Sequence, residues 1–283
     1  MHARLLRRLG ILLRRSGEKL SGLAGSDTAV PRAPDESATP PSGDFGVFLT
    51  PEASAINKAR LDHLASLGLD LSNKKVLEVG AGIGLHTEFF ERRGCDVLST
   101  DGNPGNVAEM MRRYPGRRAC VLDLDLAADI SHLGGFDIVY CYGTLYHLSK
   151  PEQALKALSQ VCREMILLET CVSLGEHTEL VLVREQIGSN MSVRGLGCRP
   201  TRSWVVEMLR KYFGHGYATR TQPAYSDFET DWDAPAAQLL HRAVFVGSRR
   251  RLENPQLHER LPHRQERVGA EGPAPPRWQG TAT

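Results

Sequence analysis

The 283-residue sequence lacks long apolar runs, has few aromatic residues and shows no paired cysteines. No stretch approaches the roughly 20 consecutive apolar residues that a transmembrane helix needs, so we expect none. The six cysteines have neither CxxC spacing nor a Cys/His pairing typical of metal sites, which favours reduced thiols, a reducing compartment and no metal. With 283 residues the chain is long enough for one large domain or two small ones, and its 41% apolar content excludes a wholly disordered polymer.

The charge is concentrated at the two ends. Residues 1–20 carry six basic side chains against Glu18, and residues 249–283 carry seven arginines against four glutamates. Because the whole chain has a net charge of only +2, the part between them is acidic. An acidic centre disfavours a nucleic-acid groove, so we expect no nucleic-acid partner.

The ends also differ from the centre in pattern. Leucines gather on one face of residues 1–20, which predicts a basic amphipathic helix that either contacts a membrane surface peripherally or docks on the domain or a partner. A secretory signal fits poorly because Arg14 and Arg15 interrupt the apolar run, whereas a mitochondrial presequence stays open. Residues 21–49 have the composition of a flexible linker, and residues 249–283 that of a disordered basic tail. We expect a cytoplasmic protein, in peripheral contact with a membrane if the helix binds one.

Strand and helix signals alternate between these ends, over residues 50–248. Thr50 followed by Pro51 starts a helix that stops at Gly68. Further helices are expected at 87–93, 107–114, 151–161 and 203–213, and strands at 75–79, 96–100, 120–122, 136–142, 165–169 and 242–247. Such alternation predicts an α/β domain with a doubly wound, mostly parallel sheet.

A glycine-rich segment, Glu78-Val79-Gly80-Ala81-Gly82-Ile83-Gly84, lies between the first expected strand and its helix. Glycines at such a turn let the backbone bend sharply and approach a ligand closely. A dinucleotide fingerprint would need a third glycine where Leu85 stands, and the acidic Glu78 suits a cationic ligand better than a pyrophosphate. A tight turn that binds no ligand is the alternative.

Acidic residues follow the next two expected strands. Asp101 stands where a carboxylate accepts hydrogen bonds from ribose hydroxyls, although it also suits a turn before Gly102-Asn103-Pro104. Asp123 and the apolar Leu124 form a pair able to hold an adenine amino group and pack against its ring. Asp125 competes with Asp123 for this role, and a solvent-facing loop acid is a further alternative.

Together, Glu78–Gly84, Asp101, Asp123-Leu124 and the strand Phe136-Asp137-Ile138-Val139-Tyr140-Cys141 resemble motifs I to IV of the class I S-adenosylmethionine-dependent methyltransferases. The resemblance spans roughly residues 50–250. It implies a seven-stranded sheet of order 3-2-1-4-5-7-6 with the last strand antiparallel, and S-adenosyl-L-methionine as cofactor. It also implies cofactor contacts for the glycine loop (Gly80, Gly82 and Gly84), for Asp101 at the ribose, for Asp123 at the adenine, and for the backbone near Cys141 at the methionine amino group.

The residues after the fourth strand are expected to line the acceptor pocket, because the corresponding loop does so in that family. His147 there is a candidate proton acceptor, since the pKa of histidine lies near neutrality, or a residue that only orients its neighbours. Tyr146 is a candidate substrate contact. Glu169, at the end of the fifth strand, is expected either to act on or bind the acceptor or to cap a neighbouring element.

The connection after the fifth strand, residues 171–200, is unusually long and is predicted to be a substrate-covering insertion, partly helical around Leu180–Glu185. Arg199 and Arg202 suit an anionic acceptor, or are plain surface charges. Trp204 suits stacking on an acceptor, or a place in the core.

The sequence therefore predicts a methyltransferase, with O-methylation of a small molecule or glycan as the expected reaction. The alternatives are a nicotinamide oxidoreductase on a similar fold and a non-catalytic binding module. No feature of the sequence indicates an oligomeric state.

Overall fold

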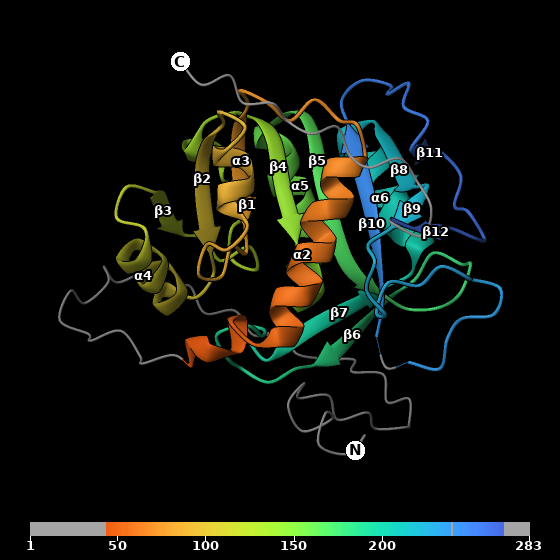
Figure 1. The fold of residues 1–283 in the computed structure, drawn as a ribbon, viewed down its shortest axis with the longest axis horizontal. Helices are drawn as coiled ribbons and strands as arrows, with labels where there is room; N and C mark the ends of the chain where they lie inside the picture. Colours follow the sequence, from red (N-terminus) through yellow and green to blue (C-terminus); the bar gives the residue numbers. More distant parts are fainter. Residues whose placement is uncertain (1–43, 239, 269–283) are drawn as a thin grey trace, which may run out of the picture.

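An eight-stranded sheet organises the protein, whose computed structural model describes residues 44–238 and 240–268 (Figure 1). Its strand order is β11-β8-β10-β5-β4-β1-β2-β3. The parallel centre consists of β1 (Lys75–Val79), β2 (Asp96–Asp101), β3 (Arg118–Val121), β4 (Phe136–Tyr142) and β5 (Cys162–Val172). Beside β5 follow β10 (His241–Ser248), β8 (His215–Thr219) and β11 (Leu257–His258), each antiparallel to its neighbour.

This topology confirms the predicted α/β class and the order 3-2-1-4-5-7-6, with β10 as the antiparallel seventh strand and β8 as the sixth. The sheet has one strand more than the seven expected, because β11 pairs with the outer edge of β8. That strand comes from the segment for which disorder was predicted.

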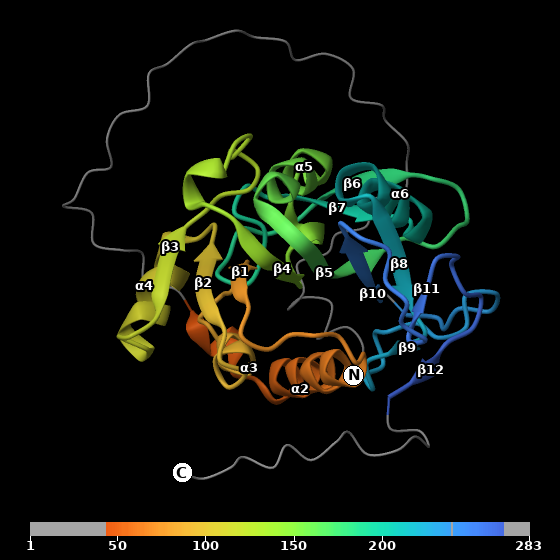
Figure 2. The same cartoon turned by 90° about the horizontal axis from the view of Figure 1, so that it is seen from above.

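Helices cover both faces of the sheet (Figure 2). On one face, α2 (Pro51–Ser66) and α3 (Thr87–Glu91) cover a cluster that includes Leu64, Phe90 and Tyr140. On the other, α5 (Pro151–Val161) and α6 (Arg202–Phe213) cover a second cluster that includes Leu77 and Leu158. The remaining helix, α4 (Pro104–Arg113), lies beside β2 and β3. Apolar side chains on both faces of the strands thus bury the sheet between two layers.

The helix boundaries follow from local capping. The Thr50 hydroxyl accepts a hydrogen bond from the Ala53 amide at 3.1 Å, and Pro51 occupies the first helical position of α2. Gly68, at φ +63°, follows the end of this helix, as predicted. Thr201 caps α6 in the same way through the Trp204 amide.

Short elements gather at the carboxyl edge of the parallel strands (Figure 1). They are the 3-10 turns η1 (Phe45–Phe48) and η3 (Leu145–His147) and a hairpin of β6 (Leu180–Arg184) with β7 (Leu196–Pro200). The helix expected around Leu180–Glu185 is therefore wrong, since this run pairs as a strand with β7. Away from this edge lie η2 (Ser131–Leu133) and the pair β9 (Thr221–Gln222) with β12 (Glu266–Arg267).

Two predictions about the ends need correction, and others fall outside the structure. Residues 45–48 form the turn η1 rather than linker, and residues 249–268 contribute β11 and β12 rather than a disordered tail. The predicted helix at 1–20 with its membrane contact, most of the linker and residues 269–283 lie outside the described residues. In the two ranges that are described, no helix is long and apolar enough to cross a membrane.

Candidate functional site

The glycine loop follows β1 at the carboxyl edge of the sheet. Gly80 and Gly82 have φ of +66° and +56°, a conformation that side chains disfavour. A Cβ at Gly80 would lie 1.9 Å from the Thr144 hydroxyl, which itself donates to the Val79 carbonyl at 3.1 Å. The loop after β1 therefore packs directly against the segment after β4, and only glycine fits there.

Asp101 ends β2 and faces this loop. Its carboxylate accepts from the Gly82 amide at 2.8 Å, from the Asn103 amide at 2.8 Å and from the Asn106 side-chain amide at 3.1 Å. Burial raises the pKa of Asp101 to about 6, although these donors oppose the shift. The Asn106 Oδ1 atom is buried with no partner in the described part of the chain, so a polar ligand with a hydroxyl donor would satisfy it.

The Glu78 side chain is buried between β2 and the start of α3. Its carboxylate accepts from the Thr87 hydroxyl at 2.6 Å and from the Ser99 hydroxyl at 2.7 Å, and burial raises its pKa. These contacts tie the start of α3 to β1 and β2. Where the sequence suggested a carboxylate for a cationic ligand, the structure places a residue that holds the loop in shape.

The two acidic residues after β3, Asp123 and Asp125, make different contacts. Asp125 is buried and accepts from the amides of Ser149 and Lys150, at the start of α5. Asp123 instead forms an ion pair with Arg194 at 2.8 Å, from the β6–β7 connection. Leu124 is buried in the core cluster under α5. Of the two acids, Asp123 is the one that remains at the surface of this edge.

The end of β4 approaches α2. Cys141 is fully buried in the core, so only its backbone can meet a ligand. Next to it, Gly143 has φ +74°, and a Cβ there would lie 3.2 Å from the Arg60 guanidinium. The Nε atom of Arg60 is buried without a partner among the described residues. The Arg60 guanidinium thus lies against the loop after β4.

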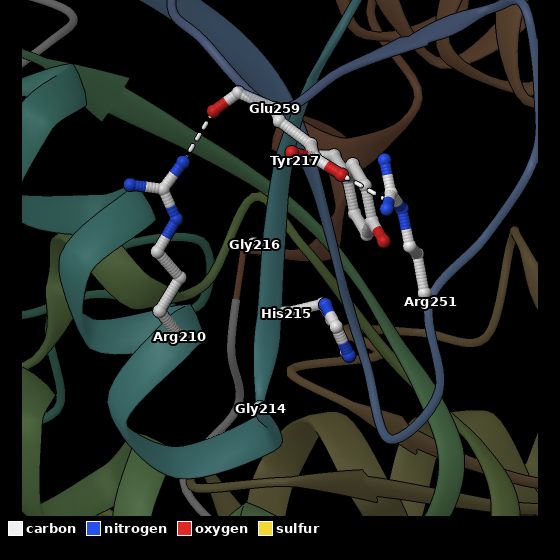
Figure 3. Close-up of a pocket in the computed structure, with 7 residues that line it drawn as sticks. All are labelled: Arg210, Gly214, His215, Gly216, Tyr217, Arg251 and Glu259. Atoms are coloured by element: carbon white, nitrogen blue, oxygen red, sulfur yellow. Dashed lines mark hydrogen bonds and ion pairs between the residues drawn. The ribbon is translucent and has the colours of Figure 1, made fainter.

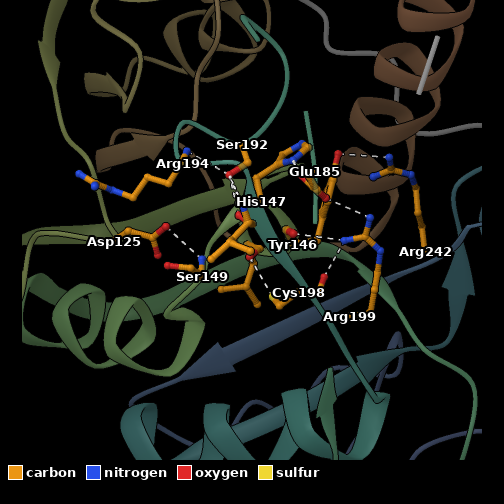
Figure 4. Close-up of polar contacts among 12 residues, drawn as sticks. Asp125, Tyr146, His147, Ser149, Glu185, Ser192, Arg194, Cys198, Arg199 and Arg242 are labelled. Carbon is orange, nitrogen blue, oxygen red and sulfur yellow. Dashed lines mark hydrogen bonds and ion pairs between the residues drawn. The ribbon is translucent and has the colours of Figure 1, made fainter. Parts of the chain in front are cut away.

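His147, in η3, has a carboxylate partner in the hairpin (Figure 4). Its Nδ1 atom lies 2.5 Å from Oε2 of Glu185, and the other carboxylate oxygen of Glu185 accepts from Arg199 at 3.0 Å. The rings of Tyr146 and His147 lie 4.0 Å apart. Burial lowers the pKa of His147, whereas Glu185 raises it. The structure therefore brings together His147, Tyr146 and Arg199, three of the predicted site residues.

Glu169 takes a different position from the one expected of a catalytic residue. Its fully buried carboxylate accepts from Arg60 at 2.7 Å and from Arg242 at 3.1 Å, so both oxygens are occupied. Arg242 also donates to the Tyr146 hydroxyl at 3.2 Å. Glu169 thus joins α2, β5 and β10, which corresponds to the structural alternative named above.

Two predicted substrate contacts point elsewhere. Arg202 donates to the Pro262 carbonyl at 2.8 Å and stacks over the Trp232 ring at 3.8 Å. Trp204 is buried in the core between α6 and the sheet. In the described residues neither side chain hydrogen-bonds to His147 or to its partner Glu185, so neither joins this cluster.

A hollow lies beside the start of β8, apart from the carboxyl edge of the parallel strands (Figure 3). It is lined by Arg210, Gly214, His215, Gly216, Tyr217, Arg251 and Glu259. Its charged groups satisfy one another, since Arg251 pairs with Glu259 at 3.1 Å and Arg210 donates to the Glu259 carbonyl. None of the predicted site residues lies there. Within residues 44–238 and 240–268, no cluster of three or more metal-ligating side chains was found either.

At the carboxyl edge of the sheet, the sequence analysis missed three residues: Arg60, Glu185 and Arg242. Only Arg60 left a signal, because it falls four residues from both Ile56 and Leu64 on the apolar stripe of the helix. A charged residue on a buried helix face indicates a buried partner.

Comparison with known proteins agrees with this geometry. Residues 77–165 match the family model described as a methyltransferase domain. A ubiquinone biosynthesis O-methyltransferase of Xanthomonas oryzae pv. oryzae (strain PXO99A) is 32% identical over 115 residues, which are 38% of this chain and 46% of that protein. The corresponding protein of Escherichia coli O157:H7 is 30% identical over 111 residues. The chain thus matches slightly less than half the length of these curated relatives.

A solved structure shares the fold. The N-terminal domain of EvdMO1, crystallised in the presence of SAH and D-fucose, superposes with a TM-score of 0.53 and 22% identity, covering 71% of this chain and 85% of that one. The predicted resemblance to methyltransferases is confirmed for residues 77–165, which match the methyltransferase family model.

Proposed function

We propose that the chain is a class I S-adenosylmethionine-dependent methyltransferase and that it methylates a hydroxyl group of a small-molecule or glycan acceptor. The observation that carries the proposal is the contact between the loops after β1 and β4. The glycine loop and Asp101 lie on one side of this contact, and His147 lies three residues beyond Thr144 on the other.

The residues of the first side fit the cofactor. Asp101 and the Asn106 Oδ1 atom, which has no partner among the described residues, would take the ribose hydroxyls, and Asp123 the adenine amino group. S-adenosylmethionine supplies a methyl group bound to a positively charged sulfur. The chain's own task is then alignment and exclusion of water, since methyl transfer needs no protein nucleophile.

His147 is the residue that would accept the acceptor's proton. Its Nδ1 atom is engaged by Glu185, and in the described residues no group hydrogen-bonds its Nε2 atom. Burial lowers the pKa of His147 and thereby favours the neutral, proton-accepting form near pH 7. The names of the curated relatives support a hydroxyl acceptor, because they are O-methyltransferases. Leu85, in place of a third fingerprint glycine, weighs against a nicotinamide oxidoreductase.

The experiment is a screen of hydroxylated small molecules and glycans with a labelled methyl donor, followed by variants on the acceptor found. His147→Ala should lower kcat by about 10²–10⁴-fold, the usual contribution of a general base, and leave donor affinity by calorimetry unchanged. His177→Ala is the matched control, since that exposed histidine also pairs with a glutamate, Glu179 at 2.9 Å. Equal turnover of the two variants would leave His147 only an orienting role.

A further inference from the structure

We propose that Glu185, in the hairpin inserted between β5 and α6, is the positioning residue for His147. The inference rests on the proposed function, because it assigns the hairpin a part in the same site. It implies that the insertion does more than cover an acceptor: it supplies the carboxylate that sets the tautomer and the protonation of the proton-accepting histidine.

The first observation is the burial of the Glu185 side chain directly after β6, a strand whose residues are half-buried or exposed. Val181 and Leu182 of β6 are 41% and 54% exposed, whereas the Glu185 side chain is only 2% exposed. A buried carboxylate is unfavourable unless it is paired and hydrogen-bonded. The polar Glu185 is thus more buried than the apolar Val181 and Leu182, so core packing does not explain this arrangement.

Both carboxylate oxygens of Glu185 are occupied, each by a different element. Oε2 lies 2.5 Å from Nδ1 of His147, and Oε1 accepts from Nη2 of Arg199 at 3.0 Å. Arg199 is itself fixed by the carbonyls of Tyr146, at 3.2 Å, and Cys198, at 2.7 Å. Because the carboxylate is held on both sides, the imidazole ring has one favoured orientation (Figure 4).

A glycine on the facing strand leaves room for this contact. A Cβ at Gly197 of β7 would lie 2.7 Å from the carboxylate carbon of Glu185 and 2.5 Å from the Tyr146 carbonyl. Any larger residue would push Glu185 away from His147. The Glu185 side chain therefore extends from the residue directly after β6, and Gly197 on β7 leaves the space for it.

The charges around His147 determine what Glu185 does to it. Four groups face the imidazole: Glu185 after β6, Arg199 from β7, Arg242 from β10 and the ring of Tyr146. Glu185 is the only anion among them, and it raises the pKa of His147 against burial and the two arginines. It also accepts the Nδ1 proton, so that Nε2 keeps its lone pair for the acceptor hydroxyl.

The test uses the whole chain, ¹⁵N-labelled and free of cofactor, with the imidazole nitrogens of His147 followed by NMR as the pH is varied. Glu185→Gln keeps an oxygen for Nδ1–H but removes the charge, so the pKa of His147 should fall by about one unit or more. Glu185→Leu should in addition abolish the preference for a protonated Nδ1. Glu179→Gln, in the same insertion and beside the exposed His177, is the control and should change neither.

A second variant tests the contact between Glu185 and His147 without changing either residue. Gly197→Ala leaves Glu185 intact but displaces it, and should lower the pKa of His147 in the same direction. With an acceptor in hand, Glu185→Gln should reduce kcat by about 10-fold or more and leave the KM for the donor unchanged. An unaltered His147 titration and tautomer in both Glu185 variants would overturn the inference. A wild-type chain without methyl transfer would instead refute the proposed function and leave the NMR result standing.

Discussion

On the two sides of the candidate site, the acids Asp101 and Glu169 are held by contacts of very different range along the chain. On the cofactor side, Asp101 bonds Gly82, which is 19 residues away. On the acceptor side, Glu169 bonds Arg60 across 109 residues, and Arg242 bonds Tyr146 across 96. Local contacts leave a pattern in the sequence, because each residue must suit a turn or cap formed by its neighbours. Distant contacts leave little beyond a charge on an apolar helix face, as at Arg60, because their partners meet only once the sheet has formed.

Removing Glu169 should have the largest effect, since it tests the long-range side. Glu169→Ala leaves two guanidiniums buried without their carboxylate, and breaking a buried ion pair from one side costs roughly 3–5 kcal/mol. We expect this loss in the free energy of unfolding, measured by urea titration. Glu164→Ala is the control on the same strand, because its surface pair with Lys74 at 2.9 Å should contribute less than about 1 kcal/mol. Similar losses in the two variants would contradict the structural role of Glu169.

This contrast explains how much of the molecule could be predicted. The bounds of β1, β4 and α5 agree with prediction because a cap, a proline or a glycine stands at their ends. The hairpin was misassigned because Leu180–Arg184 is a short apolar run, which periodicity alone does not distinguish from a helix.

The segment 249–268 was misassigned for a related reason. It has the polar composition of a disordered tail, yet its backbone and side chains bond distant parts of the fold. The Arg249 guanidinium donates to the carbonyls of Cys162 and Tyr212, and the Gln256 carbonyl accepts from the Arg220 amide. Tertiary hydrogen bonds of this kind order a chain that has no apolar periodicity of its own.

For the candidate site, the sequence named the glycine loop, Asp101, His147 and Arg199 as candidates but not Glu185, the carboxylate that pairs with His147. Glu185 and Arg199 meet His147 only because β6 and β7 pair. The positions of Arg202 and Trp204 on α6 have the same origin, since the rotation of a helix about its axis depends on packing rather than on its cap.

Gly80→Ala tests the local side and should have the next largest effect. A side chain at φ +66° is strained, and its Cβ would overlap the Thr144 hydroxyl at 1.9 Å. Strain and overpacking together should cost roughly 2–4 kcal/mol of unfolding free energy. Donor affinity should fall as well, because the loop must shift. Gly116→Ala serves as control: its Cβ would meet nothing within 4 Å, so stability should stay level or rise slightly. A Gly80→Ala protein as stable as this control would show that the loop tolerates a side chain.

The smallest expected effect distinguishes a ligand contact from a turn within the local side. Asp101→Ala should weaken S-adenosylmethionine binding by about 1.5–3 kcal/mol, the contribution of a charge-assisted hydrogen bond, measured by calorimetry. Asp129→Ala is the matched control, because Asp129 accepts from the Ser131 amide at 2.8 Å in the same kind of turn but lies apart from the glycine loop.

Because the pKa of Asp101 is raised to about 6, both donor affinity and stability should depend on pH in a defined direction. Donor affinity should weaken as the pH falls from 7.5 through 6, because the carboxylate becomes protonated, and the Asp101→Asn variant should lack this dependence. The effect on folding runs the other way: the folded state binds the proton more tightly than the unfolded chain, whose pKa is near 3.8. The contribution of Asp101 to the free energy of unfolding should therefore grow as the pH falls from about 6 towards 4. Urea titrations of wild type and Asp101→Asn at pH 5 and pH 7.5 isolate it. If only the stability difference appears and donor affinity is unchanged, Asp101 holds the turn and does not meet the ribose.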